Sequence, residues 1–154
     1  MKKLLSVAIV AMMILSLTAT AFAATGVGAH TSVDLKADGS LTVYTHICAL
    51  TLDEAGKIVG VDFDAVQVKG TANADSSYEA QSKRELGDAY GMKGISPIGK
   101  EYYEQMDALE DCCIGKTVEE VITGSADDAD LKAGCTVGID TCLLVLKEAA
   151  EFAR

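Results

Sequence analysis

Three consecutive stretches decide the fold: residues 41–52 (LTVYTHICALTL), 53–57 (DEAGK) and 58–68 (IVGVDFDAVQV). The first and third are rich in Val, Thr, Ile and aromatic residues, which favour strands, and the second is a short polar segment that contains glycine. Two such runs joined by a short turn predict an antiparallel hairpin. We expect residues 24–32 before it to be a mobile lead-in. The polar residues 70–78 after it are expected to form a loop, with a further strand as the alternative.

Polar and apolar residues alternate most clearly in the third stretch. Val59, Val61 and Phe63 alternate there with Asp62 and Asp64. Alternation with a period of two places these sets on opposite faces of a strand, so we expect one face of the sheet to meet water.

Helical periodicity follows the strands. Ser96-Pro97 predicts a helix start, because Ser caps helices and Pro suits the first helical position. One apolar stripe then runs to Gly115, a shorter helix is expected over 116–122, and a last helix over 140–154. The first stripe comprises Tyr102, Met106, Leu109 and Cys113; the last comprises Cys142, Leu143, Leu146, Ala149, Ala150 and Ala153. Strands followed by helices predict an α+β fold, an antiparallel sheet built on a hairpin with helices packed on one face.

Residues 1–23 have the pattern of a cleavable secretory signal peptide. Lys2 and Lys3 precede a short apolar run over 4–17, and Ala-Phe-Ala at 21–23 matches the small-residue cleavage site. The run is shorter than the ~20 apolar residues of a membrane span. We therefore expect a secreted, extracytoplasmic protein whose residues 24–154 form a single domain.

The charge of the mature chain limits its partners. Removing the signal leaves 11 basic and 23 acidic residues, a net charge of −12. Binding to polyphosphates depends on clustered Lys and Arg, so we expect no nucleic-acid partner. We also expect no stable membrane insertion after signal cleavage.

Cysteine spacing indicates neither a metal site nor a defined disulfide framework. The chain has five cysteines, at positions 48, 112, 113, 135 and 142. With an odd number, at least one cysteine has no disulfide partner within the same chain. No C-x-x-C motif and no zinc-finger spacing occurs. Cys135 and Cys142 can pair if their Cα atoms come within about 7 Å. On the helical stripe, Cys113 is expected to be buried and Cys112 to point away.

A short motif precedes the last predicted helix. Residues 130–136 (DLKAGCT) resemble the flavin-attachment motif of the FMN-binding domain family, D-x-x-(S/T/A)-G-A-(T/S). Asp130, Gly134 and Thr136 match it, whereas Cys135 stands where the family usually has Ala. Gly138 also replaces a common Ser or Thr. Residues 85–93 and 98–105 look similar to exported proteins of anaerobic Gram-positive bacteria that are related to this family.

The resemblance implies a function in electron transfer. The family includes extracytoplasmic subunits of sodium-pumping and ferredoxin-linked oxidoreductase complexes, in which a flavin transferase joins the FMN phosphate to the motif's Thr hydroxyl. It implies that Thr136 carries FMN, with Gly134 and Asp130 as cofactor-binding neighbours, and that a redox partner exists outside the cytoplasm. In such a protein the flavin supplies the redox chemistry, so we expect an electron carrier or binding protein rather than a catalyst.

Several residues leave alternatives open. Thr136 is otherwise a residue that caps the last helix, a role that Asp140 fills equally well. Residues 91–100 hold two lysines and no acid, which suits an anionic ligand or a tight turn. The tyrosines either stack on a flavin ring or pack in the core; they are Tyr44, Tyr78, Tyr90, Tyr102 and Tyr103.

Hydrolytic catalysis has little support, because the chain has no G-x-S-x-G elbow and no assignable nucleophile–base pair. His46 is expected to be a half-exposed strand residue. The alternative to a flavoprotein is a secreted, non-redox binding or cell-surface interaction module on the same scaffold, with a degenerate flavin motif.

The signal pattern gives a first testable prediction. In an exporting host the mature protein should begin at Ala24, because the cleavage site ends at Ala23. N-terminal sequencing of the secreted protein measures this directly, and secreted material that begins at Met1 would contradict export by cleavage.

Overall fold

The computed structural model describes residues 23–71, 80–124 and 129–154. Residues 1–22 of the expected signal peptide, Tyr78 and most of the expected loop over 70–78 lie outside the described residues. Among the described residues, no helix combines the length and the apolar character that crossing a bilayer requires.

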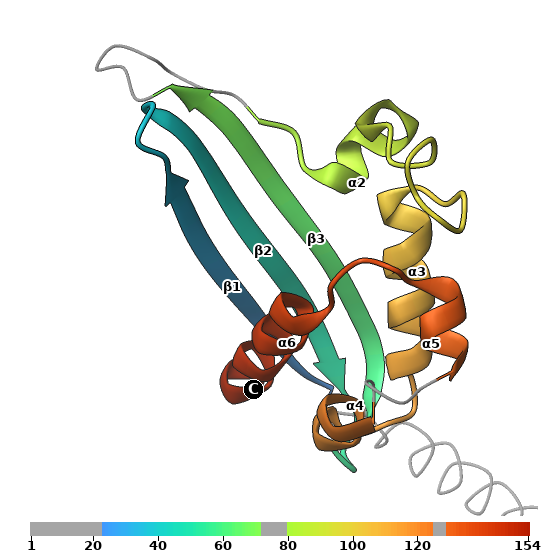
Figure 1. The fold of residues 1–154 in the computed structure, drawn as a ribbon. Coiled ribbons are helices and arrows are strands. Elements are labelled where there is room, and N and C mark those ends of the chain that lie inside the picture. Colours follow the sequence, from blue (N-terminus) through green and yellow to red (C-terminus); the bar gives the residue numbers. More distant parts are fainter. Residues whose placement is uncertain (1–22, 72–79, 125–128) are drawn as a thin grey trace, which may run out of the picture.

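The structure confirms the α+β class and the hairpin. β2 (Ser40–Leu52) and β3 (Ile58–Thr71) are antiparallel, and the sheet order is β1-β2-β3 (Figure 1). Asp53 closes the turn between β2 and β3, since its Oδ1 accepts the backbone N–H groups of Ala55 at 2.9 Å and Lys57 at 2.8 Å. Gly56 has φ +74°, a left-handed conformation that favours glycine.

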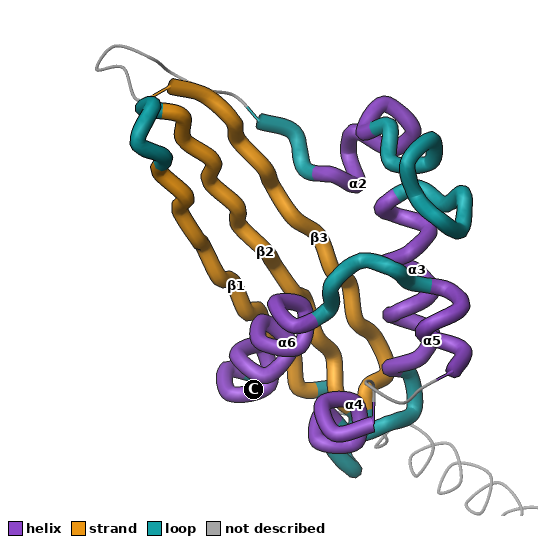
Figure 2. Tube along the Cα trace, viewed as in Figure 1, coloured by secondary structure: helices purple, strands orange, loops and turns teal. Residues whose placement is uncertain are grey.

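The prediction of a mobile lead-in over residues 24–32 is wrong, because these residues belong to the edge strand β1 (Ala24–Leu35). Its glycines allow α6 (Asp140–Phe152) to lie directly on the strand (Figure 2). A Cβ atom on Gly26 would lie 2.0 Å from the carbonyl oxygen of Ala149, and one on Gly28 would lie 2.0 Å from that of Val145. The same glycines make the local sequence look unstructured, so the strand becomes recognisable only with the helix in place.

The predicted alternation in β3 holds for Val61 and Phe63 but fails at Val59. A register irregularity between Thr51 and Leu52 pairs Leu52 with Ile58 and interrupts the alternation. Ile58 is therefore fully buried, whereas Val59 is 52% exposed. A bulge of this kind changes the face toward which the following side chains point.

The helices follow the strands, as expected. They are α2 (Lys83–Leu86), the 3₁₀ turn η1 (Gly87–Tyr90), α3 (Tyr102–Cys113), α4 (Val118–Gly124), α5 (Ala129–Gly134) and α6. α6 crosses the half of the sheet where β1 begins, and α3 lies alongside β3 (Figure 1). We call the sheet face that α6 covers the inner face. α5 is a further helix that the periodicity did not predict.

The predicted start of α3 at Ser96-Pro97 is wrong. The chain turns there, with Gly99 N–H donating to the Ser96 carbonyl at 3.0 Å and Gly99 at φ +63°. The helix begins five residues after Pro97, at Tyr102, and the backbone N–H of Glu101 donates to Glu104 Oε2 at 2.8 Å. This is the reciprocal half of a capping box, so an acidic pair replaces the expected serine cap.

The predicted stripes form the core between the inner face and the helices. All four members of the α3 stripe are buried, as are Cys142, Leu146 and Ala149 of α6. Cys113 is fully buried and Cys112 is half-buried, which confirms the predicted register of α3. None of the five cysteines is in a disulfide, so the open alternative of a Cys135–Cys142 pair is not realised.

Close contact between β1 and α6 gives the second prediction. Gly28→Ala should lower the free energy of unfolding by about 1–3 kcal/mol or more, because the new methyl group meets backbone that cannot rotate away. Chemical denaturation followed by circular dichroism measures the change.

Gly60→Ala is the matched control for Gly28→Ala. The nearest atom to its new Cβ is Thr51 Cβ at 3.5 Å, an ordinary contact. Equal losses of stability in the two variants would contradict the tight packing of α6 on β1.

Candidate functional site

Thr136, the predicted attachment residue, lies in the loop between α5 and α6 and is exposed. Three donors of this loop converge on the side-chain oxygen of Gln105. They are the backbone N–H of Thr136 at 2.8 Å, its hydroxyl at 3.1 Å and the backbone N–H of Val137 at 3.3 Å. Thr136 therefore does not cap α6, and Asp140 lies in the first turn without acting as the N-cap.

Gln105 ties this loop to residues 91–100. It is fully buried on α3, and its Nε2 donates to Ser96 Oγ and to the Lys100 carbonyl, each at 3.1 Å. One side chain thus joins the two stretches that the sequence singled out separately. A buried amide whose donors and acceptor are all used fixes both loops in place.

The backbone N–H groups of residues 91–100 that suit an anion bind a carboxylate of the protein itself. The carboxylate of Glu101, which is 1% exposed, accepts the backbone N–H of Met92 at 2.9 Å and that of Lys93 at 2.8 Å. Backbone N–H groups in such a turn otherwise suit an external anion. Because Glu101 already occupies them, the structure favours the turn over the ligand site.

The other motif residues have structural roles or fall outside the described side chains. Gly134 packs against α3, where a Cβ atom would lie 2.7 Å from Ala108 Cβ. The missing side chain of Gly134 therefore allows close packing against α3, and not close approach to a phosphate as the motif implies. Cys135 is 7% exposed, and burial raises the pKa of its thiol. Asp130 lies in α5, and its side chain is outside the described part of the structure.

A second polar centre lies one helical turn away from Gln105. Lys83 of α2 is 8% exposed, and three tyrosine rings surround its ammonium group. The distances from Nζ to the ring centroids are 4.7 Å for Tyr102, 5.1 Å for Tyr90 and 5.6 Å for Tyr44. We call these three rings the tyrosine cage. Cation–π attraction offsets part of the cost of burying the charge.

Burial leaves several polar atoms at the cage without partners. Among the described residues, buried Tyr102 Oη and His46 Nδ1 have no hydrogen-bonding partner. The ion pairs found there belong to Arg84, so the contacts that surround Lys83 Nζ are the three tyrosine rings. Desolvation lowers the pKa of Lys83, and it lowers the pKa of His46 together with the nearby Lys83 charge. Unsatisfied buried groups of this kind are unusual and indicate an uncompensated site.

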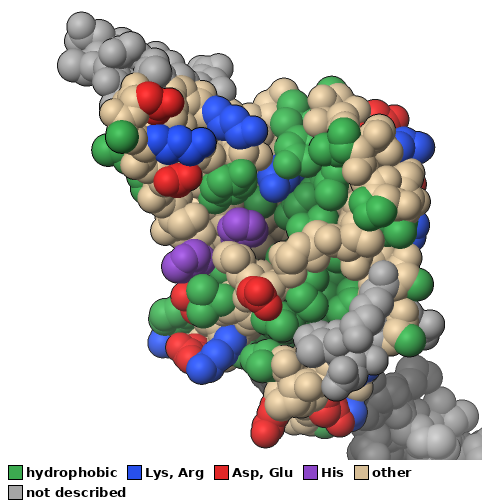
Figure 3. Space-filling view, in the orientation of Figure 1, with side chains coloured by type: hydrophobic (Ala, Val, Ile, Leu, Met, Phe, Trp, Pro, Cys, Tyr) green, Lys and Arg blue, Asp and Glu red, His purple; other side chains and the backbone are tan. Residues whose placement is uncertain are grey.

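The cage opens on the half of the inner face that α6 leaves uncovered. His46 and Tyr44 follow each other on the inner side of β2, with stacked rings whose centroids are 6.2 Å apart. His46 is half-buried, as predicted, and His30 is its partner across the β1–β2 pair. Figure 3 shows the histidines beside a hollow that is bordered by hydrophobic and cationic side chains.

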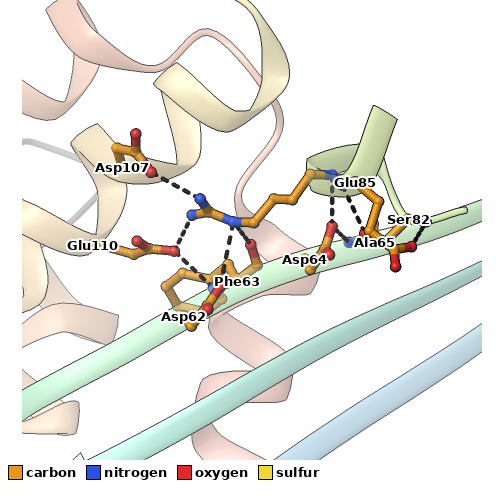
Figure 4. Close-up of polar contacts among 9 residues, drawn as sticks. Asp62, Phe63, Asp64, Ala65, Ser82, Glu85, Asp107 and Glu110 are labelled. Atoms are coloured by element: carbon orange, nitrogen blue, oxygen red, sulfur yellow. Dashed lines mark hydrogen bonds and ion pairs between the residues drawn. The ribbon is translucent and has the colours of Figure 1, made fainter. Parts of the chain in front are cut away.

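Arg84 holds α2 and α3 against the free edge of β3. Its Nε donates to the Phe63 carbonyl at 2.7 Å, and its guanidinium pairs with Glu110 and, at 2.8 Å, with Asp107 of α3. Glu110 in turn accepts the Phe63 N–H at 2.8 Å (Figure 4). Lys83 precedes Arg84, so this clamp also places Lys83 at the cage.

Sequence reasoning missed Lys83, Glu101 and Gln105. The Ser82-x-x-Glu85 capping box signals the start of α2, and both of its hydrogen bonds are present. Gln105 occupies an apolar-stripe position, three residues after Tyr102 and four before Leu109, where a polar residue is a signal of a buried role. No group of three or more potential metal ligands occurs among the described residues.

Comparison with known proteins gives one partial relative and no family. No family model matches the chain, and no solved structure matches it significantly. The chain is similar to a protein named chlorophenol reductase from Desulfitobacterium hafniense, with 42% identity over 94 residues that cover 50% of this chain and 28% of the relative. The matched part therefore spans well under a third of that curated protein.

The junction at Gln105 gives the third prediction. Gln105→Met keeps the volume but leaves the loop donors and the Lys100 carbonyl without their partner, so the free energy of unfolding should fall by about 1–3 kcal/mol. Hydrogen exchange at the Thr136 and Val137 amides should accelerate more than exchange in the sheet. Gln81→Met, at an exposed position, is the matched control. Unchanged exchange at both amides would contradict the anchoring role.

Proposed function

We propose that this protein is an exported flavoprotein of the FMN-binding domain type, with FMN attached covalently to Thr136, and that it transfers electrons outside the cytoplasm. The observation that carries the proposal is an exposed hydroxyl on a fixed loop. Thr136 is open to an approaching transferase, while Gln105 holds its backbone N–H and its hydroxyl. A nucleophile that is exposed and already oriented reduces the entropy cost of the attachment step.

The surroundings of Thr136 suit a phosphate. α6 begins four residues further on, and no side chain caps its N-terminus. The free N–H groups and the positive end of the helix dipole favour an anion there. Asp140 in the first turn opposes this effect.

The attachment chemistry requires an activated FMN donor and a transferase. The Thr136 oxygen forms a bond to the FMN phosphorus, the anhydride bond of a donor such as FAD breaks, and the nucleoside monophosphate (AMP for FAD) leaves. The hydroxyl proton passes to a base of the transferase or to water. Cys135 does not compete as the nucleophile, because it is buried with a raised pKa and the reactive form of cysteine is the thiolate.

The partial relative fits a redox function. That protein is named a reductase, and the match covers a minor part of it. We infer that the shared segment serves electron delivery, with the flavin supplying the redox chemistry. The protein acts in this proposal as an electron carrier for an extracytoplasmic redox partner.

One observation favours the alternative, a secreted non-redox interaction module. The sheet face opposite α6 exposes apolar side chains, with Val27, Val33 and Leu35 between 60% and 63% exposed. An open hollow of about 630 Å³ on that face is bordered by Val27, Ala49 and Phe152 among others. Exposed apolar surface often marks a contact site.

The fourth prediction tests the attachment residue. Coexpression with a flavin transferase in an exporting host should give a yellow protein that carries one FMN, measured by intact mass and visible absorption. Thr136→Val should abolish attachment and cost less than about 1.5 kcal/mol of stability, since it removes one hydrogen bond at an exposed site. Thr136→Ser should retain attachment, because the chemistry needs only the hydroxyl.

Cys135→Ala is the matched control, since it restores the residue usual in the family beside an unchanged Thr136. It should not reduce attachment. Wild-type protein that stays colourless beside an active transferase, with a known substrate labelled in the same cells, would favour the interaction module.

A further inference from the structure

We propose that Lys83, the tyrosine cage and His46 form the seat of the flavin ring system, with the Lys83 ammonium against the N1–C2 carbonyl edge of the ring. This inference rests on the proposed function for the identity of the ligand. The residues of the seat itself lie outside the attachment motif.

Buried polar atoms without hydrogen-bonding partners favour a ligand that carries hydrogen-bonding groups. Lys83 is 8% exposed and Tyr102 is 2% exposed. Among the described residues, Tyr102 Oη and His46 Nδ1 are buried without a hydrogen-bonding partner, and the contacts that surround Lys83 Nζ are the three tyrosine rings. Burial of an ammonium group is unfavourable, and the cation–π contacts of Lys83 offset only part of that cost. A ligand that brings an oxygen or nitrogen acceptor to Nζ removes this imbalance.

The aromatic surroundings call for a planar ligand. The Tyr44 and His46 rings lie on the inner face, with an interplanar angle of 16°, and Tyr90 meets Tyr102 edge to face at a centroid distance of 5.9 Å. Tyr44, Tyr90 and His46 are only half-buried, so their rings offer surface for stacking. A fused aromatic ring with polar atoms on one edge satisfies both requirements.

α3 connects this seat to the attachment loop. Tyr102 belongs to the cage and Gln105 holds Thr136, and residues three apart on a helix are neighbours on one face. A flavin whose phosphate is fixed at Thr136 therefore has the cage beside it. The sugar-alcohol chain of FMN provides the reach between the two points.

Lys83 gives the seat its electrostatic effect. If an external reductant gave two electrons and solvent gave one proton to a bound ring, the Lys83 ammonium would stabilise the single negative charge that results, in a poorly solvated site. The expected consequence is a more positive midpoint potential than the same flavin would have without the lysine.

The fifth prediction separates the ring seat from the attachment. Riboflavin has no phosphate and cannot be attached, so it reports on the seat alone. Wild-type protein without attached flavin should quench riboflavin fluorescence, and Lys83→Met should quench it much less at equal concentration. Lys83→Arg, which keeps the cation, should retain most of the quenching. Lys147→Met removes an exposed lysine of α6 and should not alter it.

In flavinylated protein, the same variants report on the potential. Lys83→Met should shift the midpoint potential to more negative values by at least about 30 mV, which corresponds to a tenfold loss of binding of the reduced relative to the oxidised ring for a two-electron couple. Lys147→Met should leave the potential unchanged. If circular dichroism shows that Lys83→Met does not fold, Tyr44→Leu, at a half-buried position, replaces it in both measurements.

The outcomes distinguish this inference from the proposed function. Attached FMN whose potential is the same in wild type and Lys83→Met overturns the ring seat and leaves the flavoprotein function standing. Lys83-dependent quenching by a chain that no transferase labels supports the seat and overturns covalent attachment. Absence of both attachment and quenching overturns both.

Discussion

The free edge of β3 is the constraint on which the rest of the structure depends. At Phe63 the strand presents an N–H and a carbonyl that no neighbouring strand can pair, and both are partly buried beneath the helices. Glu110 and Arg84 satisfy them and pair with each other. Because buried backbone groups without partners are costly, this arrangement fixes where α2 and α3 lie relative to the sheet. The clamp thereby sets the positions of Lys83, Tyr102 and Gln105, which belong to these two helices.

α3 therefore contributes one side chain to each of the two polar centres. Near its N-terminus Tyr102 contributes to the cage around Lys83, and one turn later Gln105 holds the loop of Thr136. Together these two residues connect six segments. The cage takes side chains from β2, α2, η1 and α3, and Gln105 adds residues 91–100 and the loop before α6. If FMN is bound as proposed, the phosphate and the ring rest on neighbouring parts of the same rigid element, which limits the motion of the ring.

The glycines of β1 decide which part of the sheet remains accessible. With no side chain at Gly26 and Gly28, α6 packs backbone to backbone on the first half of the strand. The rest of the inner face, with His30, His46 and Tyr44, is left beyond the helix. Side chains of ordinary size at the two glycines would push α6 away from β1 and disrupt the core beneath it. The same packing that stabilises the domain thus leaves an aromatic surface of the sheet uncovered.

The sequence by itself determined the hairpin, the α3 and α6 stripes and the α+β class, because periodicity and turn composition are local properties that packing here reinforces. It also marked Thr136 through a motif. It misplaced β1, because the glycines that allow contact with Val145 and Ala149 resemble a flexible segment until the helix is present. It did not find Lys83 or Gln105 as site residues. Only the tertiary structure decided those roles, since burial, ring contacts and hydrogen bonds between residues 31 positions apart depend on how the elements pack and not on local pattern.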